Sequence, residues 1–191
     1  DSITATIAKK EIEVSALTVK DKAYNGTKTA EVNTITFSGE VTSQTTGSKY
    51  QANLDTNAST AEFAEAGVGT HNVTFNLVLT STSQNYYTLK PYTGTVQGEI
   101  TKRTLTGNTQ KTGTLLMHGE DLFDDPTIDG VNNEKVTGTF TYSYDGKTSK
   151  TDISSALRTA GVKEGGYNVG FTFTPATDGN YTGTVTGTLT I

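Results

Sequence analysis

Short sequence motifs of the first half of the chain recur in the second half in the same order. Each copy lies about 90–95 residues beyond its counterpart. The matched segments are 66–68 with 160–162, 73–75 with 169–171, 85–86 with 180–181, and 94–96 with 183–185. A constant order at a nearly constant spacing indicates one structural unit present twice. The repeat therefore predicts two similar units in this chain of 191 residues.

A second internal similarity places the junction between the units. Residues 5–10, Ala-Thr-Ile-Ala-Lys-Lys, resemble residues 98–103, Gly-Glu-Ile-Thr-Lys-Arg. We therefore expect a first unit at 1–101 and a second at 102–191, with residues 1–7 forming the end of a preceding unit or an edge strand. Because the second unit begins directly after the first, the linker between them is very short. A short linker leaves little free hinge, which favours an elongated, stiff arrangement of modules.

Threonine is far above its ordinary share, with 40 residues, whereas proline occurs three times and glycine twenty times. Threonine is β-branched and suits the half-buried face of a sheet. Apolar residues alternate with polar ones in the runs 12–14, 17–19, 35–37, 73–79, 87–89, 140–144, 169–173 and 189–191. Turn signals separate these runs, at Asn25-Gly26, Thr46-Gly47, Asp129-Gly130, Asp145-Gly146 and Asp178-Gly179. The pattern predicts an all-β chain of antiparallel sandwich type, with helix expected only at 59–66 and 153–160.

Composition excludes several functions. No apolar run approaches the roughly 18 residues that a membrane helix needs, so we expect no membrane insertion. The formal net charge of -5 is spread evenly, which argues against a nucleic-acid partner. The chain has no cysteine, and so no disulfide, thiolate nucleophile or cysteine-based zinc site.

The stretch Lys-Ala-Tyr-Asn-Gly-Thr-Lys-Thr-Ala at 22–30, with Phe63, 68–69 and 85–86 downstream, resembles the YDG and MBG-type repeats. The second half is similar to bacterial immunoglobulin-like repeats, through 173–175 and 180–183. The resemblance implies immunoglobulin-like β-sandwich modules, found in tandem in bacterial surface proteins and adhesins, that carry no catalytic residues. Asn25 stands where an Asp is usual, and Asp-Asp-Pro at 124–126 replaces the Tyr-Asp-Gly turn in the second half.

No combination of residues predicts an enzyme. His71 and His118 lie in unrelated contexts, and both are interpreted as ordinary loop or surface residues. The acidic side chains are scattered over loops, so paired carboxylates for glycoside hydrolysis are not expected. We expect no cofactor and no catalytic residue.

One acidic segment allows a hypothesis of calcium binding. Five carboxylates fall within ten residues, and carboxylate oxygens are the ligands that Ca²⁺ prefers. They belong to Glu120, Asp121, Asp124, Asp125 and Asp129. The spacing lacks the glycine and the final glutamate of an EF-hand loop. The alternative is a solvated loop whose carboxylates stay apart, and this alternative is favoured.

Tyrosines offer a second hypothesis, binding of a sugar ring. Tyr86, Tyr87 and Tyr92 cluster around one predicted loop. Alternation requires one or two of them to point inward, and the repeat matches Tyr86 to Tyr181, which suggests a structural tyrosine at a corner of the fold. A lysine cross-link from Lys20 or Lys22 is not expected, because the last strand has no Asn or Asp partner.

The predicted function is that of a non-catalytic repeat module of a bacterial cell-surface or secreted protein, acting as a stiff spacer or adhesive stalk. Expected partners are neighbouring repeats of the same chain and host or matrix glycans or proteins. The alternative is a carbohydrate-binding module that uses exposed tyrosines. In both cases we expect an extracellular location.

Overall fold

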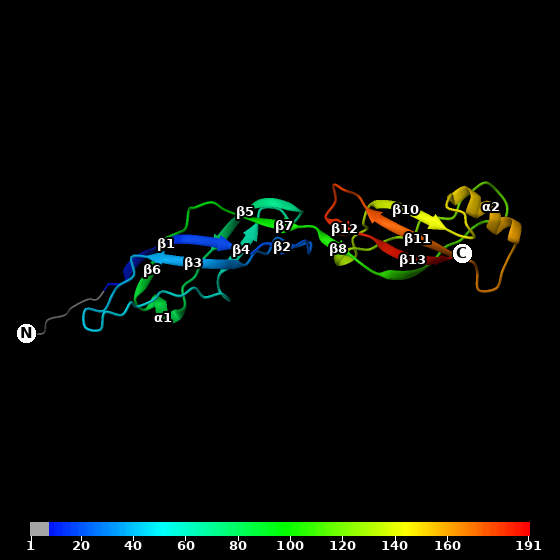
Figure 1. Ribbon diagram of the computed structural model, residues 1–191. Coiled ribbons are helices and arrows are strands. Elements are labelled where there is room, and N and C mark those ends of the chain that lie inside the picture. Colours follow the sequence, from blue (N-terminus) through cyan, green and yellow to red (C-terminus); the bar gives the residue numbers. More distant parts are fainter. Residues whose placement is uncertain (1–7) are drawn as a thin grey trace, which may run out of the picture. The chain divides into compact units, whose positions relative to one another are not determined.

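The structure is a computed structural model that describes residues 8–191 (Figure 1). The strand expected within residues 1–7 lies outside the described residues. Strands make up 43% of the structure and helices 10%, which confirms the all-β prediction. The chain divides into two compact units. The first unit contains the described residues up to Ala23 and Thr27–Thr101, and the second contains Tyr24–Gly26 and Lys102–Ile191.

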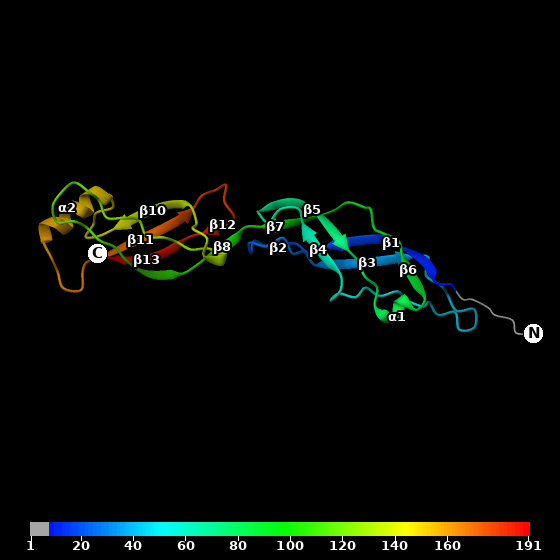
Figure 2. The ribbon, with the colours of Figure 1, turned by 180° about the vertical axis from the view of Figure 1, so that it is seen from behind.

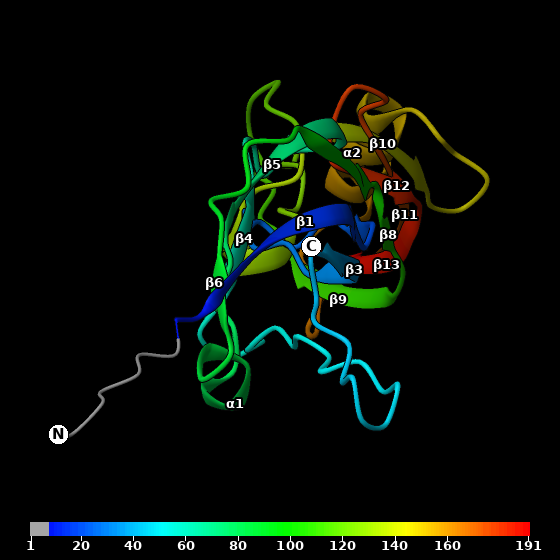
Figure 3. The same cartoon turned by 90° about the vertical axis from the view of Figure 1, so that its left-hand side faces the viewer.

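The first unit has two sheets. Its elements are β1 (Lys10–Val19), β2 (Lys22–Ala23), β3 (Val32–Ser38), β4 (Thr60–Phe63), β5 (Gly69–Asn76), the short helix α1 (Ser81–Gln84), β6 (Tyr87–Leu89) and β7 (Val96–Thr101). One sheet has the order β3-β1-β6 and the other the order β2-β7-β5-β4 (Figures 1 and 2). Two pairings are parallel, β1 with β6 and β2 with β7, and the others are antiparallel. Helix α1 lies beside β6 (Figure 3).

The second unit also has two sheets. Its elements are β8 (Arg103–Leu105), β9 (Asn108–Thr112), a 3-10 turn η1 (Val131–Asn133), β10 (Gly138–Ser143), α2 (Lys150–Ala160), β11 (Asn168–Pro175), β12 (Tyr181–Gly183) and β13 (Val185–Thr190). The sheet orders are β12-β8 and β10-β11-β13-β9. The parallel pairings are β8 with β12 and β9 with β13, so the second unit has the same scheme of parallel pairs as the first. Among the named strands, β3 alone has no counterpart there.

Period-2 alternation builds the core of the second unit. Along β11, the side chains of Val169, Phe171 and Phe173 all point inward and are at most 4% exposed. Burying an aliphatic or aromatic side chain of this size stabilises the fold by about 1.5–3 kcal/mol. The other buried members of this core are Phe123, Ile128, Tyr142, Ile153, Leu157, Val185 and Leu189.

One of the two predicted helices is confirmed. Helix α2 begins after Ser149, whose side chain accepts a hydrogen bond from the Asp152 N–H, and it ends at Gly161, where φ is 82°. Ile153 and Leu157 are spaced by four residues and point into the core. In the described part of the chain, no helix is long and apolar enough to cross a membrane.

The helix predicted at 59–66 is wrong, because the segment forms strand β4. Ala61 and Phe63 are buried and alternate with exposed neighbours, and β4 pairs antiparallel with β5. The residues of the segment include good helix formers, but pairing with β5 decides its conformation. Tertiary contacts therefore override the local preference.

The pairing of β1 with β3 contains two irregularities. The register shifts between Val14 and Ala16 and again between Thr18 and Val19. Each shift is the mark of a β-bulge, which bends the strand and increases its twist. Among the described strands, β3 has a single partner, so its outer edge forms one border of the sheet.

Candidate functional site

Tyr87 is a buried anchor of the first unit. It begins β6, lies opposite Lys10 of β1, and is 1% exposed. Its hydroxyl donates to the carbonyl of Tyr50 and accepts a hydrogen bond of 3.0 Å from the N–H of Val41. The hypothesis that Tyr87 offers a face to a sugar is therefore wrong, because the ring belongs to the core.

The neighbouring Tyr86 is exposed and stacks on Tyr50. The ring centroids lie 5.6 Å apart, with an angle of 27° between the ring planes. Tyr86 is 52% exposed and Tyr50 is 48% exposed. Val41 accepts a backbone hydrogen bond from Tyr50, and its side chain is 44% exposed. We call Val41, Tyr50 and Tyr86 the aromatic shelf.

Hydrogen bonds fix the backbone of both tyrosines of the shelf. The N–H of Tyr50 donates to Val41 at 3.0 Å, and its carbonyl accepts from the Tyr87 hydroxyl. The N–H of Tyr86 donates to Ser83 at 3.1 Å, and its carbonyl accepts from Lys10 at 2.8 Å. A site whose backbone is fixed in this way loses little conformational entropy when it binds a ligand.

A residue of helix α1, Ser83, links the two segments that form the shelf. The Ser83 side chain is 2% exposed and accepts from the Asn53 N–H at 2.9 Å and from the Thr80 hydroxyl at 3.0 Å. Thr80 also caps the helix by accepting from the Ser83 N–H. These bonds tie the segment that carries Tyr86 to the segment that carries Tyr50.

Tyr92 does not join the shelf. Its ring is half-buried and packs edge-on against Phe75, with centroids 5.8 Å apart. Of the three tyrosines predicted as ligand contacts, Tyr86 alone therefore lies in an exposed aromatic pair. Sequence reasoning missed its partner, Tyr50, which lies in a polar loop outside any alternating run.

Among the acidic candidates, Asp125 is held by an ion pair. Its carboxylate accepts from the Tyr142 hydroxyl and from Lys150 at 2.8 Å, and the Lys150 ammonium lies 5.1 Å from the centre of the Phe123 ring. Partial burial raises the pKa of the Asp125 carboxyl, but the hydrogen bonds from Lys150 and Tyr142 outweigh it and hold the pKa below its usual value. Burial, together with this carboxylate, raises the pKa of Tyr142 strongly.

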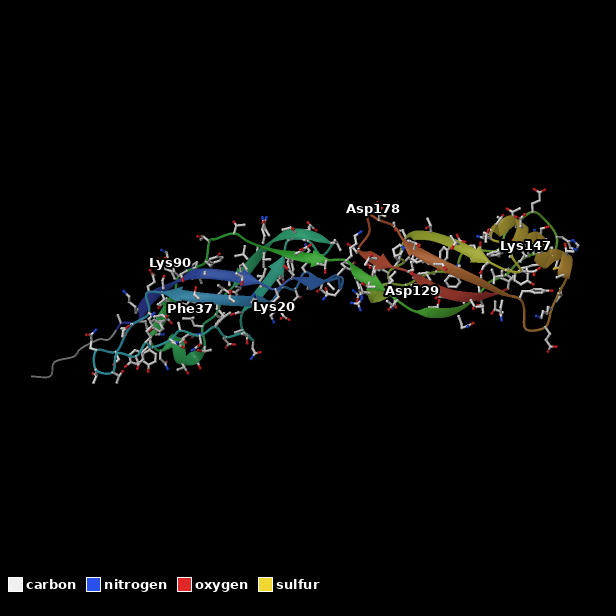
Figure 4. The ribbon with its side chains drawn as sticks, viewed as in Figure 1. Lys20, Phe37, Lys90, Asp129, Lys147 and Asp178 are labelled. Atoms are coloured by element: carbon white, nitrogen blue, oxygen red, sulfur yellow. The ribbon has the colours of Figure 1, made fainter. Side chains whose placement is uncertain are left out.

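The acidic residues do not converge on a metal site. The Asp129 carboxylate lies 3.9 Å from the Lys111 ammonium. Figure 4 shows that Asp129 and Lys147 lie at opposite ends of the second unit. The backbone carbonyl of Asp121 accepts a hydrogen bond from the Arg158 guanidinium. Over residues 8–191, no group of three or more His, Cys, Asp or Glu side chains could hold a metal ion. The calcium hypothesis for Glu120, Asp121, Asp124, Asp125 and Asp129 therefore has no structural support, because their carboxylates do not gather.

The remaining polar candidates have ordinary contacts. One ring nitrogen of His71 lies 2.9 Å from the carbonyl of Gly67, and His118 is exposed. Lys20, which is labelled in Figure 4, pairs with Glu31 at a distance of 2.9 Å between Nζ and Oε2. Lys22 donates to the Thr29 carbonyl at 2.8 Å, and its ammonium lies 5.3 Å from the centre of an aromatic ring, that of Phe63. Burial lowers the pKa of Lys22.

The second unit has an apolar cavity of about 230 Å³ beside α2. Leu115, Met117, Leu157 and Tyr167 contribute to its walls, together with Val162, which is 89% exposed. Its lining residues include one ionisable group besides the tyrosine, that of Lys163. The cavity can accept apolar groups, but it brings together no set of reactive side chains.

The match found by comparison with known proteins lies in the first unit. No curated protein and no solved structure matches the chain. A family model described as the YDG domain matches residues 8–96, which run from the residues before β1 into the start of β7 and include the whole aromatic shelf. The resemblance drawn from the segment 22–30 is confirmed to this extent: residues 8–96 form a YDG domain.

Proposed function

We propose that the chain is a non-catalytic repeat module of a bacterial cell-surface protein, acting as a stiff spacer or adhesive stalk. The observation that carries the proposal is the parallel pairing of an early strand with the last strand in each unit. In the first unit β2 pairs with β7, and in the second β9 pairs with β13.

This pairing suits a protein that bears tension. Tension on the two ends of a unit pulls an early strand and the last strand in opposite directions along their length. Because the hydrogen bonds of a parallel pair are evenly spaced, they share such a load. In the second unit the pairing runs from Asn108 opposite Thr186 to Thr112 opposite Thr190. Rupture therefore requires these bonds to break together, whereas a hairpin pulled from its open end breaks them one by one.

We further propose that each unit is an immunoglobulin-like β-sandwich and that the two are tandem repeats. Each unit has two sheets and the same scheme of parallel pairs. The YDG domain in residues 8–96 supports this assignment for the first unit. The implied location is extracellular, and the implied partners are neighbouring repeats and host or matrix molecules.

A non-catalytic role also agrees with where the perturbed ionisable groups lie. Burial raises the pKa of Tyr181 to about 12, with a further contribution from its hydrogen bond to Glu134. The Tyr181 hydroxyl also accepts a hydrogen bond of 2.7 Å from the Val131 N–H. Tyr142 is likewise bonded, to Asp125. Both phenols thus have structural partners.

Single-molecule force spectroscopy tests the proposal. The chain is placed between marker domains of known unfolding force and pulled from its two ends. Two separate unfolding events are expected, each releasing on the order of 300 Å for a unit of about 90 residues. The event from the second unit is expected at the higher force, because β9 and β13 pair over more residues than β2 and β7. Extension without discrete force peaks would contradict a load-bearing role.

A further inference from the structure

We propose that the aromatic shelf is a carbohydrate-binding site that stacks one hexopyranose ring of a neutral glycan on Tyr50 or Tyr86. This inference goes beyond the spacer role and does not depend on it.

The first step is that the fold does not require the Tyr86 ring. Tyr87 lies opposite Lys10 of the first strand, and Tyr181 lies opposite Arg103, the first residue of β8. The counterpart of Tyr181 is therefore Tyr87, and not Tyr86 as the sequence repeat predicted, and the position of Tyr86 falls on Asn180 in the second unit. The structural tyrosine of this corner is Tyr87, which leaves the neighbouring exposed ring without a role in the core.

The second step concerns the hydroxyl groups. Five tyrosines donate their hydroxyls to a carbonyl or carboxylate of the protein, namely Tyr24, Tyr87, Tyr142, Tyr167 and Tyr181. Within the described residues, the hydroxyls of Tyr50 and Tyr86 have no such partner. The shelf therefore combines two half-exposed aromatic faces with two hydroxyls that are available to a ligand.

The third step matches this surface to a ligand. A pyranose ring has an apolar face of C–H groups and a rim of hydroxyls. The C–H face packs on an aromatic ring, while the rim exchanges hydrogen bonds with phenol hydroxyls, which act as donor and acceptor. The Tyr50 and Tyr86 side chains carry no charge, so a neutral sugar is favoured over an anionic ligand.

The size of the shelf argues against a second copy of the chain as its occupant. Aromatic side chains offer about 150–250 Å² each, so two half-exposed rings and Val41 present at most about 300 Å². A stable protein interface buries about 800 Å² on each partner. One or two sugar rings, in contrast, need no larger surface.

The test is a screen of the full 191-residue chain on an array of immobilised neutral oligosaccharides of hexoses and N-acetylhexosamines. The best ligand is then titrated in solution. Tyr50→Ala and Tyr86→Ala are each expected to weaken binding at least tenfold. Tyr50→Phe and Tyr86→Phe keep the ring and remove one hydroxyl, and a smaller loss of two- to fivefold is expected. Val162→Ala, a change at an exposed apolar residue of the second unit, serves as the matched control and is expected to leave the affinity unchanged.

Three results would overturn the proposal. The first is an array without binding, and the second is unchanged affinity in the Tyr50→Ala/Tyr86→Ala double variant. The third is self-association of the chain that Tyr86→Ala abolishes, since the shelf would then be an interface between copies. Circular dichroism and thermal unfolding of each variant establish that the fold is retained. None of these results alters the force measurement that tests the spacer role.

Discussion

Tyr87 and Tyr181 hold the same structural position in their respective units. Each begins a strand that runs parallel to the first strand of its unit, and each is at most 5% exposed. Each hydroxyl accepts a hydrogen bond from the N–H of a valine, Val41 in the first unit and Val131 in the second. A buried tyrosine thus fixes a distant loop to the strand that carries it, and it does so twice in this chain.

Replacing Tyr87 with phenylalanine tests this anchoring role. The change removes the partner of the Val41 N–H and of the Tyr50 carbonyl. The two lost hydrogen bonds contribute about 0.5–1.5 kcal/mol each, so the free energy of unfolding of the first unit should fall by about 1–3 kcal/mol. Urea denaturation measures it. Tyr86→Phe is the control, with an expected change below about 0.5 kcal/mol. Equal effects of the two substitutions would refute the distinction between anchor and surface residue.

Gly187→Ala tests the close approach of β13 to its neighbours. A Cβ at this position would lie 2.3 Å from the carbonyl oxygen of Thr109 in β9 and 2.5 Å from the Phe171 ring in β11. Such overpacking costs typically about 1–3 kcal/mol, and it pushes β9 away from β13. We expect a lower melting temperature and a lower unfolding force for the second unit, with the first unit unaffected.

The control for this substitution is Gly179→Ala. A Cβ there has its nearest contact at 3.5 Å, the carbonyl of Ala176, which is an ordinary distance. Its expected effect on the free energy of unfolding is within about 0.5 kcal/mol. If Gly187→Ala lowers the free energy of unfolding no more than this control does, the close approach of β13 to β9 and β11 does not limit the size of the side chain at position 187.

Alkaline pH should destabilise the second unit. The pKa of Tyr181 is raised from 10.0 to about 12, first by burial and then by its hydrogen bond to Glu134. The unfolded chain loses this proton near pH 10 while the folded unit retains it. The stabilising contribution is therefore complete below pH 10 and is lost as the pH rises toward 12.

Denaturant unfolding at pH 9 and pH 11 measures this effect, for which we expect Tyr181 to contribute a decrease of about 1 kcal/mol. Tyr181→Phe should show a shallower dependence on pH, although Tyr142 retains its own contribution. A pH dependence identical in the wild type and in Tyr181→Phe would show that this phenol ionises equally in the folded and unfolded states.

Acidic pH should weaken the contact between Asp125 and Lys150. The pKa of the Asp125 carboxyl is lowered from 3.8, because the hydrogen bonds from Lys150 and Tyr142 outweigh the effect of burial. Its contribution is present above pH 3.8 and is lost as the pH falls through the lower value of the folded state. The carboxylate is 54% exposed, so we expect a change of at most about 1 kcal/mol.

Comparing Asp125→Asn with the neighbouring Asp124→Asn isolates this contact. The first substitution should reduce the loss of stability between pH 5 and pH 3, and the second should leave it unchanged. A reduction of the same size in both variants would assign the effect to the overall charge of the segment.

Calcium should not stabilise the protein. The carboxylates from Glu120 to Asp129 do not gather, and Asp125 is already bonded to a lysine. The melting temperature measured by calorimetry is therefore expected to be the same in millimolar calcium chloride and in EDTA. A calcium-dependent rise that Asp124→Asn removes would restore the metal-site hypothesis.

The parts of the fold that depend on neighbours along the chain could be predicted from the sequence. The alternation of Val169, Phe171 and Phe173 corresponds to β11. The Asp145-Gly146 pair forms a tight turn with φ values of 47° and 73°, as Asp-Gly pairs favour. In both cases the conformation is decided by a few consecutive residues.

The parts that depend on distant partners could not be predicted. Tyr86 and Tyr87 are adjacent and identical in type, so the pairing of β6 with β1 decides which one is buried. Tyr50 is held in the aromatic shelf by distant partners, since its carbonyl bonds the Tyr87 hydroxyl and its N–H bonds the Val41 carbonyl. Of the three tyrosines named by the sugar-binding hypothesis, Tyr86 therefore lies in the shelf, whereas Tyr87 and Tyr92 do not.

The two bulges in the pairing of β1 with β3 have a consequence for association between copies of the protein at high concentration. An open strand edge is a template on which another chain can add a strand, and flat, regular edges are the most prone to do so. The shift after Val14 leaves Ser15 of β1 unpaired, and the shift after Thr18 leaves Asn33 of β3 unpaired, so that the pair is twisted and the outer edge of β3 does not match a straight strand. At high protein concentration we therefore expect the β3 edge to resist the addition of a strand from another chain.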